Sequence, residues 1–210
     1  ARTGRKLTID GVIDLRILPS PQLSVANVRL SNAKGATDAD MIRLDAMQVH
    51  VALAPLIGGA VQISSVTLVR PVISLERFAD GSVNWELPGG ADGDAGSGDA
   101  RPEGGAGGVG VRLDGAKIID GSVIFRDVGV TKPHRVEDLD ATIVASSLDG
   151  PFSAKGGLTY QGLKTSFEAK IGRIDSGRAT AAKLQLDLPG AGGAFSFEGI
   201  FDTKAAPSLS

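Results

Sequence analysis

The chain has 210 residues, 42% of them apolar, so it is long and apolar enough to bury a core. Its formal net charge of −2 and its aromatic content of only 4% argue against a nucleic-acid-binding protein, which needs a basic surface or stacking side chains. The absence of cysteine excludes disulfides, thiolate metal sites and a cysteine nucleophile. No run approaches the ~18 apolar residues of a membrane-spanning helix.

Short alternating segments predict β-strands from the start of the chain. Apolar and polar residues alternate at Leu7–Ile9 and at Ile42–Leu44, and many of the apolar residues are β-branched. Helical periodicity is nearly absent, with single turns expected at 37–41 and at 54–57. Turn-forming pairs separate the strands, among them Asp80-Gly81, Asp114-Gly115 and Asp120-Gly121. The sequence therefore predicts a mostly β protein with antiparallel sheets.

A repeat runs through the first part of the chain, with apolar residues at offsets 0, 2, 5 and 7 and copies that start 19 residues apart. The copies are Leu23, Val25, Val28 and Leu30; Ile42, Leu44, Met47 and Val49; and Val61, Ile63, Val66 and Leu68. Leu7, Ile9 and Val12 begin the same pattern. Short apolar pairs also fit many spacings by chance, and the equal step is what favours a true repeat.

The centre of each copy holds two small or polar residues: Ala26-Asn27, Asp45-Ala46 and Ser64-Ser65. Because side chains alternate with period two along a strand, such a pair marks either a β-bulge or a change of the buried face. The spacing reads the same in both directions, so antiparallel neighbours can align these pairs. We expect a shared crease that bends the sheet into a gutter.

A compositional boundary divides the chain. Residues 89–110 are dominated by glycine and alanine, carry several acids and contain no large apolar residue, which predicts a flexible linker. It separates a β segment at 1–88 from a second one at 111–210. The second segment continues the alternation, for example at Leu184–Leu188 and Phe195–Phe197.

Catalytic and metal-binding patterns are missing from the sequence. His50 lies within an apolar run and His134 in a polar turn, and neither has a histidine or carboxylate nearby at ligand spacing. We therefore expect no enzyme activity, no catalytic residue, no metal site and no cofactor.

Six motifs of the first segment follow one another in a recognisable order and spacing. They are Gly4–Gly11, Leu18–Pro21, Val28–Ala33, Leu53–Leu56, Val66–Pro71 and Asp80–Glu86. This arrangement resembles the N-terminal region of the AsmA family over residues 4–88, and Ile118–Asp127 resembles the element that follows there. Trp85 belongs to the signature; its simplest role is packing across the Asp80-Gly81 hairpin, with a membrane or lipid contact as the alternative.

The resemblance implies a large periplasmic protein, anchored by an N-terminal inner-membrane helix that would precede this sequence, with a role in outer-membrane biogenesis. Larger relatives in the family look like lipid carriers with a curved, apolar sheet. The partner expected from the resemblance is thus phospholipid or another amphipathic envelope component, besides the inner membrane and other envelope proteins.

An open gutter needs only an apolar concave face to hold acyl chains, since each buried methylene contributes ~0.8 kcal/mol. Within the repeat we assign the lipid contact to five residues: Ile9, Val25, Ile63, Val66 and Leu68. The alternative is a structural module whose apolar face is ordinary core and whose sheet edge assists the assembly of outer-membrane proteins. The sequence does not separate the two, because a core-facing and a lipid-facing strand read alike.

Overall fold

A computed structural model of the chain describes residues 5–18, 20–52, 62–85, 115–145, 150–173, 180–189 and 192–201. These residues form one twelve-stranded β-sheet, and none of them is helical. The strands are β1 (Leu7–Ile9), β2 (Ile13–Arg16), β3 (Gln22–Ser31), β4 (Asp40–Val51), β5 (Ile63–Val69), β6 (Val72–Glu76), β7 (Gly115–Arg126), β8 (His134–Ala145), β9 (Phe152–Tyr160), β10 (Leu163–Ile171), β11 (Thr180–Leu188) and β12 (Gly193–Phe201). The mostly β prediction is confirmed.

The strands follow one another across the sheet almost in chain order, from β1 and β2 to β12. Two positions in this order are each filled by a pair of short strands: β1 and β2 both pair with β3, and β5 and β6 both lie between β4 and β7. All pairings are antiparallel except those of β5 and β6 with β7, which are parallel. The sheet is therefore mixed, and its parallel seam joins the two predicted β segments.

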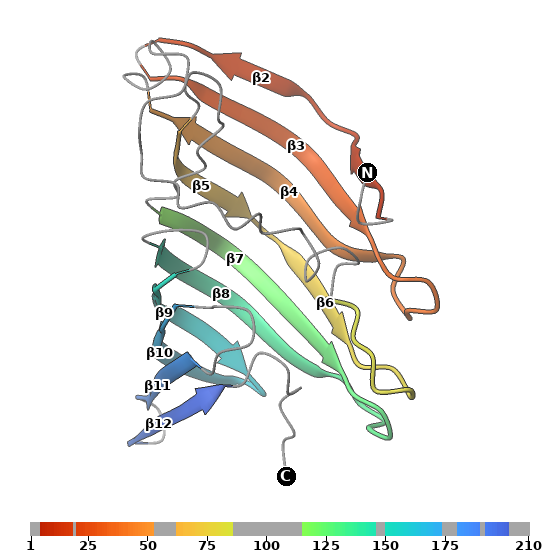
Figure 1. Cartoon of the computed structure of the whole chain (residues 1–210), viewed down its shortest axis with the longest axis vertical. Coiled ribbons are helices and arrows are strands. Elements are labelled where there is room, and N and C mark those ends of the chain that lie inside the picture. The colour runs from red at the N-terminus through yellow and green to blue at the C-terminus, as the bar shows by residue number, and fades with distance from the viewer. Residues whose placement is uncertain are drawn as a thin grey trace, which may run out of the picture.

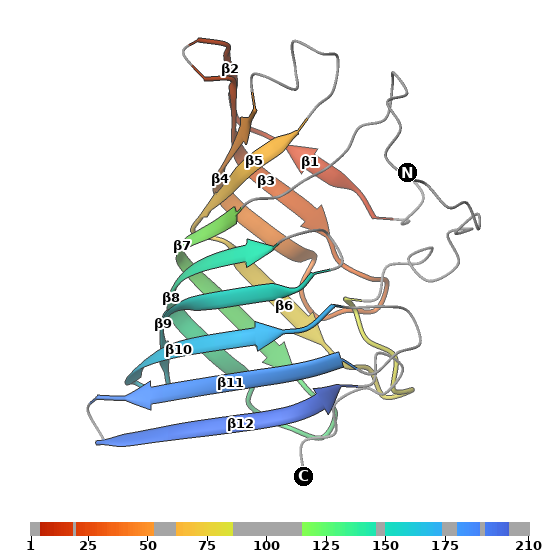
Figure 2. The ribbon, with the colours of Figure 1, turned by 60° about the vertical axis from the view of Figure 1, so that its left-hand side comes forward.

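The sheet is strongly curved. Figures 1 and 2 show β1–β7 on one side of the bend and β10–β12 on the other, with the bend itself near β8 and β9. The result is a gutter that is open along one side. The predicted linker at 89–110 lies outside the described residues, and the boundaries at 88 and 111 stay predictions.

A line of backbone irregularities crosses the sheet, and we call it the crease. It begins at the β1–β2 break, where Asp10 N donates to Asn27 O and Ala26 N donates to Val12 O. It then passes through residues that are neighbours in the strand register: Ala26-Asn27, Asp45-Ala46, Arg70-Pro71, Asp120-Gly121 and Asp138-Leu139. Asn27, Arg70, Asp120 and Asp138 all have φ between 47° and 53°.

The positive φ of Asn27 explains the spacing of the repeat in β3. The strand kinks at this residue, so apolar residues on either side of it stay on one face although they are three apart, and the register with β4 is unchanged. Val25 and Val28 flank Asn27; both are buried, and they pack in one cluster with Leu44. The crease thus keeps a single apolar face continuous through a bend, as the sequence predicts for β3 and β4.

The third predicted pair is misplaced. Ser65 pairs with His50, and the register shifts at the next position, so Ser64-Ser65 marks a separate bulge away from the crease. The crease enters this part of the sheet at Arg70-Pro71 instead. Proline lacks a backbone N–H and Arg70 takes positive φ, which together divide β5 from β6. The sequence pattern does not distinguish the two irregularities, because each follows a short apolar pair, Val61 and Ile63 or Val66 and Leu68.

Three local predictions have clear outcomes. The Asp80-Gly81 turn is present, with Gly81 at φ +83° and its N–H donating to Phe78 O. Asp120-Gly121 is not a turn but a bulge within β7, because the neighbouring strands hold both sides of it in the sheet. Residues 37–39 are a bend leading into β4 rather than a helical turn. Residues 54–57 and Asp114 lie outside the described residues.

Candidate functional site

The strand register separates apolar from polar side chains on the two faces of the sheet. Residues paired across neighbouring strands point to the same face. One unbroken row of such pairs runs from β2 to β12 and is entirely apolar. It consists of Leu15, Leu23, Val49, Val66, Ala116, Ile143, Ala154, Ala169, Leu184 and Phe197.

A second apolar row lies two residues further along each strand on the same face. It consists of Ile13, Val25, Met47, Leu68, Ile118, Ala141, Gly156, Phe167, Leu186 and Phe195. We call the surface made by these two rows the apolar face. It spans both predicted β segments without interruption.

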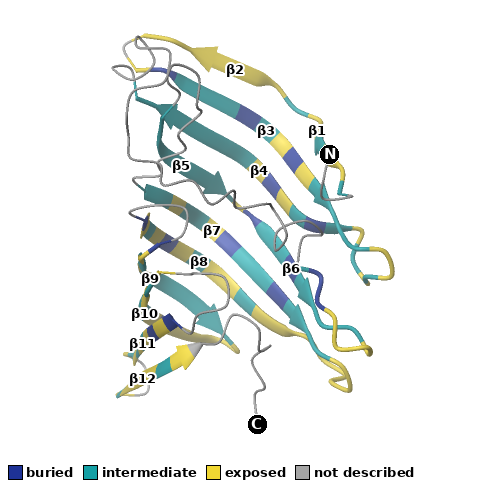
Figure 3. Ribbon diagram, viewed as in Figure 1, coloured by how far each residue is buried: buried dark blue, intermediate teal, exposed yellow. Residues whose placement is uncertain are grey.

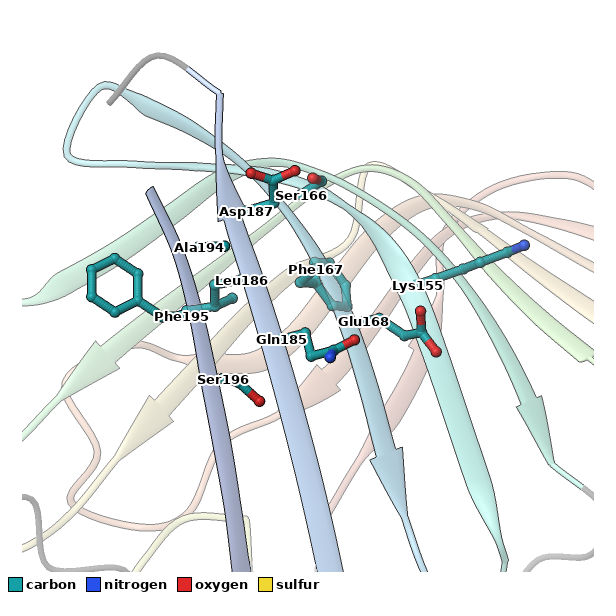
Figure 4. Close-up of a pocket in the computed structure, with 10 residues that line it drawn as sticks. All are labelled: Lys155, Ser166, Phe167, Glu168, Gln185, Leu186, Asp187, Ala194, Phe195 and Ser196. Atoms are coloured by element: carbon teal, nitrogen blue, oxygen red, sulfur yellow. The ribbon is translucent and has the colours of Figure 1, made fainter. Parts of the chain in front are cut away.

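The row between them projects from the opposite face and is polar throughout. It consists of Asp14, Ser24, Gln48, Thr67, Lys117, Thr142, Lys155, Glu168, Gln185 and Ser196. Figure 4 shows its β9–β12 end, where Lys155, Glu168, Gln185 and Ser196 lie on successive strands around a shallow groove of about 460 Å³. This face is solvated and charged.

Two adjacent alanines on β11 show that the apolar face is the crowded, inward one. Ala182, on the apolar face, is only 8% exposed, whereas its neighbour Ala181, on the polar face, is exposed. No second sheet and no helix covers either face within the described residues. The burial of Ala182 therefore comes from its neighbours in the same curved sheet, which crowd together on a concave surface.

Exposure along the apolar face rises from its middle toward its edges. Val25 and Leu44 are buried, whereas Leu15 at one edge is 65% exposed and Phe195 at the other is also 65% exposed. Figure 3 shows buried positions within β3 and β4 and exposed ones on β2 and β12. The gutter thus has a packed floor and open rims, and large exposed apolar side chains in contiguous rows are typical of binding surfaces.

The structure brings most of the sequence-predicted lipid contacts together. Val25, Val66 and Leu68 lie on the apolar face of β3 and β5, on either side of β4. Val25 is 3% exposed, so it belongs to the floor, while Val66 and Leu68 are half-buried. Ile9 pairs with Val28 at the rim and is 40% exposed; half-buried Ile63 pairs with Val51 beyond the Ser64-Ser65 bulge.

The exposed aromatic residues of β12 were missed by the sequence reasoning as candidate contacts. Phe195 and Phe197 alternate with serine, and that alternation predicted the strand correctly. It did not show that β12 continues the face that begins at β2, because that follows only from the register of every strand between them. The sequence signal for this continuation was the apolar alternation that both segments share.

Polar groups of the described residues form structural contacts. His50 contacts Ser65 on the polar face, and the His134 Nδ1 atom lies 2.7 Å from the Tyr160 hydroxyl. The Lys170 ammonium hydrogen-bonds Glu168 and, helped by the charges of Lys155 and Lys183, lowers the pKa of that carboxyl. No group of histidine and acidic side chains among residues that the structure describes could hold a metal ion, and no helix there could cross a membrane.

Comparison with known proteins agrees with the motifs of the first segment. The model of the AsmA family matches residues 1–172, which includes the first segment and β7 to β10. No curated protein and no solved structure matches the chain.

Proposed function

The chain belongs to the AsmA family, whose membership indicates a function in the cell envelope related to the outer membrane, and we propose that it holds lipid acyl chains along its apolar face. The ligand would be phospholipid or another amphipathic envelope component, moved between the inner and outer membranes. In this proposal the protein works in the periplasm and is held at the inner membrane in its full-length form.

One observation carries the proposal: two unbroken apolar rows cross the sheet from β2 to β12, and the row between them on the other face is wholly polar. A sheet that packs only its own core needs a second layer over such a face. Acyl chains can supply that layer, since each methylene they bury contributes ~0.8 kcal/mol and requires no directed polar group.

The rims give the clearest test. Phe195 and Phe197 are 65% and 57% exposed, so replacing both with aspartate places charge on the apolar face without burying it. Ala194 and Ser196 alternate with them on the polar face of the same strand and are exposed as well, which makes Ala194→Asp with Ser196→Asp the matched control.

The measurement is native mass spectrometry of protein purified from cell envelopes without detergent. We expect lipid on the wild-type protein and on the control, and little or none on the Phe195→Asp, Phe197→Asp variant, with all three melting at similar temperatures. A wild-type protein that carries no lipid would overturn the proposal, and equal lipid on all three proteins would remove β12 from the binding surface.

A second function, assistance to the assembly of outer-membrane proteins, is favoured by the free edge of β12. Among the described residues β12 pairs with β11 alone, so its outer edge offers unpaired backbone groups to a client strand. The same purification separates the two functions. A co-purifying β-rich polypeptide in place of lipid supports assembly.

A further inference from the structure

The tip of the β7–β8 hairpin is apolar and exposed. Val128 and Val130 are 52% and 49% exposed, on either side of Gly129 at φ +78°. The turn is held by Asp127, whose side chain accepts from Val128 N and whose carbonyl accepts from Val130 N. Polar residues usually occupy such tips. The hydrogen bonds of the turn use only backbone N–H groups at 128 and 130, so the turn does not require valine side chains there.

Basic residues follow the two valines. Lys132 and Arg135 are exposed, and in the described ranges neither is part of a salt bridge. On the tip side of these two residues the acidic group is Asp127, which is paired with Arg77 at 3.4 Å, while Glu137 and Asp138 lie further along β8. The hairpin therefore presents apolar side chains at its tip and, just behind them, two basic side chains that form no salt bridge within the described residues.

An aromatic row lies beside the base of this hairpin. The ring of Trp85 is 6.1 Å from that of Phe125, Phe125 is 6.5 Å from His134, and His134 stacks on Tyr160 at 6.2 Å. Trp85 and Tyr160 are the only tryptophan and tyrosine in the sequence. These two residue types combine an apolar ring with a polar group, and they concentrate at the boundary between lipid and water.

The register places these features at one end of the gutter. Phe125 at the end of β7 pairs with His134 at the start of β8, and Val136 on β8 pairs with Tyr160 at the end of β9. Figure 1 shows the β7–β8 hairpin extending beyond this end of the sheet, next to the segment that follows β6. The apolar face reaches the same end through Phe125 and its neighbours.

We propose that this end of the gutter docks on an anionic phospholipid bilayer. Val128 and Val130 enter the headgroup region, Lys132 and Arg135 face the lipid phosphates, and the aromatic row lies at the water–lipid boundary. The apolar face then opens onto the bilayer, so that acyl chains can enter it without crossing water. Docking goes beyond the proposed function, because a protein can bind a membrane surface without holding lipid in its gutter.

The test is co-sedimentation of the chain with vesicles of phosphatidylcholine alone or mixed with phosphatidylglycerol. We expect binding to the mixed vesicles that weakens at high salt. Val128→Ser with Val130→Ser should weaken it at least tenfold, which is about 1.4 kcal/mol, because the variant loses the apolar contact of both valines with the bilayer. Lys132→Gln and Arg135→Gln should each weaken it about fivefold, and only on vesicles that contain phosphatidylglycerol.

Val144→Ser is the matched control. Val144 is 49% exposed, as Val130 is, but it lies near the opposite end of β8 on the polar face. Its replacement should leave vesicle binding unchanged. Docking is overturned if the Val128, Val130 variant binds like the wild type, if Val144→Ser loses as much, or if no vesicle is bound. Failure of docking leaves the proposed function standing, because lipid in the gutter is measured separately on protein purified without detergent.

Discussion

Leu44 on β4 and Phe197 on β12 lie on the same apolar face, yet Leu44 is 8% exposed and Phe197 is 57% exposed. Around Leu44 the crease folds the face onto itself, so Val25 and Val28 pack against its side chain. Around Phe197 the described register of β11 and β12 is regular, and β12 is an edge strand. One pattern of alternation thus serves as core in the first half of the sheet, β1–β8, and as open surface in the second half, β9–β12.

The polar contacts also differ between the two halves, being buried in the first and exposed in the second. At the end of β6, the fully buried Asn84 accepts from Glu76 N and donates to Asn32 Oδ1 and Ser74 O. In the part of β9–β12 that the structure describes, the ion pairs Lys170–Glu168 and Lys183–Glu198 are exposed on the surface. Buried side-chain hydrogen bonds therefore stabilise the first half, whereas the second half is stabilised mainly by its backbone hydrogen bonds.

The largest effect should come from a charge in the packed half. Leu44→Asp buries an unpaired carboxylate among Val25 and Val28, which costs several kcal/mol of a total stability of ~5–15 kcal/mol. We expect loss of cooperative unfolding in thermal melts followed by circular dichroism. The exposed neighbour Arg43 faces the other side, and Arg43→Asp should melt close to the wild type. Two stable variants would mean that the first half is as open as the second.

The polar lock of the first half should come next. Asn84→Ala removes three hydrogen bonds and leaves Glu76 N and Ser74 O without their partner, so we expect a loss of about 3 kcal/mol in urea unfolding. Ser82→Ala, in the exposed turn just before, is the control and should cost well under 1 kcal/mol. An equally small effect of Asn84→Ala would show that the network contributes little to holding β6.

A smaller effect is expected where the two halves meet. A Cβ on Gly156 would lie 1.9 Å from Asp140 O, whereas one on Gly157 would meet Thr165 O at an ordinary 3.8 Å. Gly156→Ala must therefore displace β9 from β8, and we expect it to cost about 2 kcal/mol in urea unfolding. Gly157→Ala should cost less than half as much. If the two variants are equally stable, the close approach of β8 and β9 is not what shapes the bend.

Much of this architecture is predictable from the sequence, and the reasons are local. Alternation and turn residues predict a mostly β chain, and the repeat predicts that Ala26-Asn27 and Asp45-Ala46 align on neighbouring strands, as they do in the register. The continuation of the crease through Arg70, Asp120 and Asp138 was not predicted, because positive φ at arginine or aspartate has no sequence signature as strong as that of glycine.

The candidate site is predictable only in outline. The sequence names Val25, Val66 and Leu68 as lipid contacts, but it cannot tell that Val25 is floor while Phe195 is rim. That distinction depends on distance from the sheet edge and on curvature, which are properties of all the strands together. The parallel pairing of β5 and β6 with β7, which unites the two segments, is likewise long-range.

The smallest effect concerns pH and again separates the halves. Burial acts to raise the pKa of Asp38, but hydrogen bonds from Ser74 and Arg126 outweigh it and hold the pKa below its usual value. A pKa lowered by folding stabilises the protein at pH values above the ordinary aspartate pKa, about 3.9, and this contribution is lost as the pH falls through the folded pKa.

Asp38→Asn should therefore reduce the free energy of unfolding at neutral pH by no more than about 1 kcal/mol, because the Asp38–Arg126 pair is partly exposed. The difference from the wild type should shrink in urea unfolding at progressively more acid pH. Glu168 on β10 also has a lowered pKa, but it lies in an exposed ion pair, so Glu168→Gln should change the pH profile less. A wild-type and an Asp38→Asn profile that run parallel down to acid pH would show that the Asp38–Arg126 pair does not help to lock the first half.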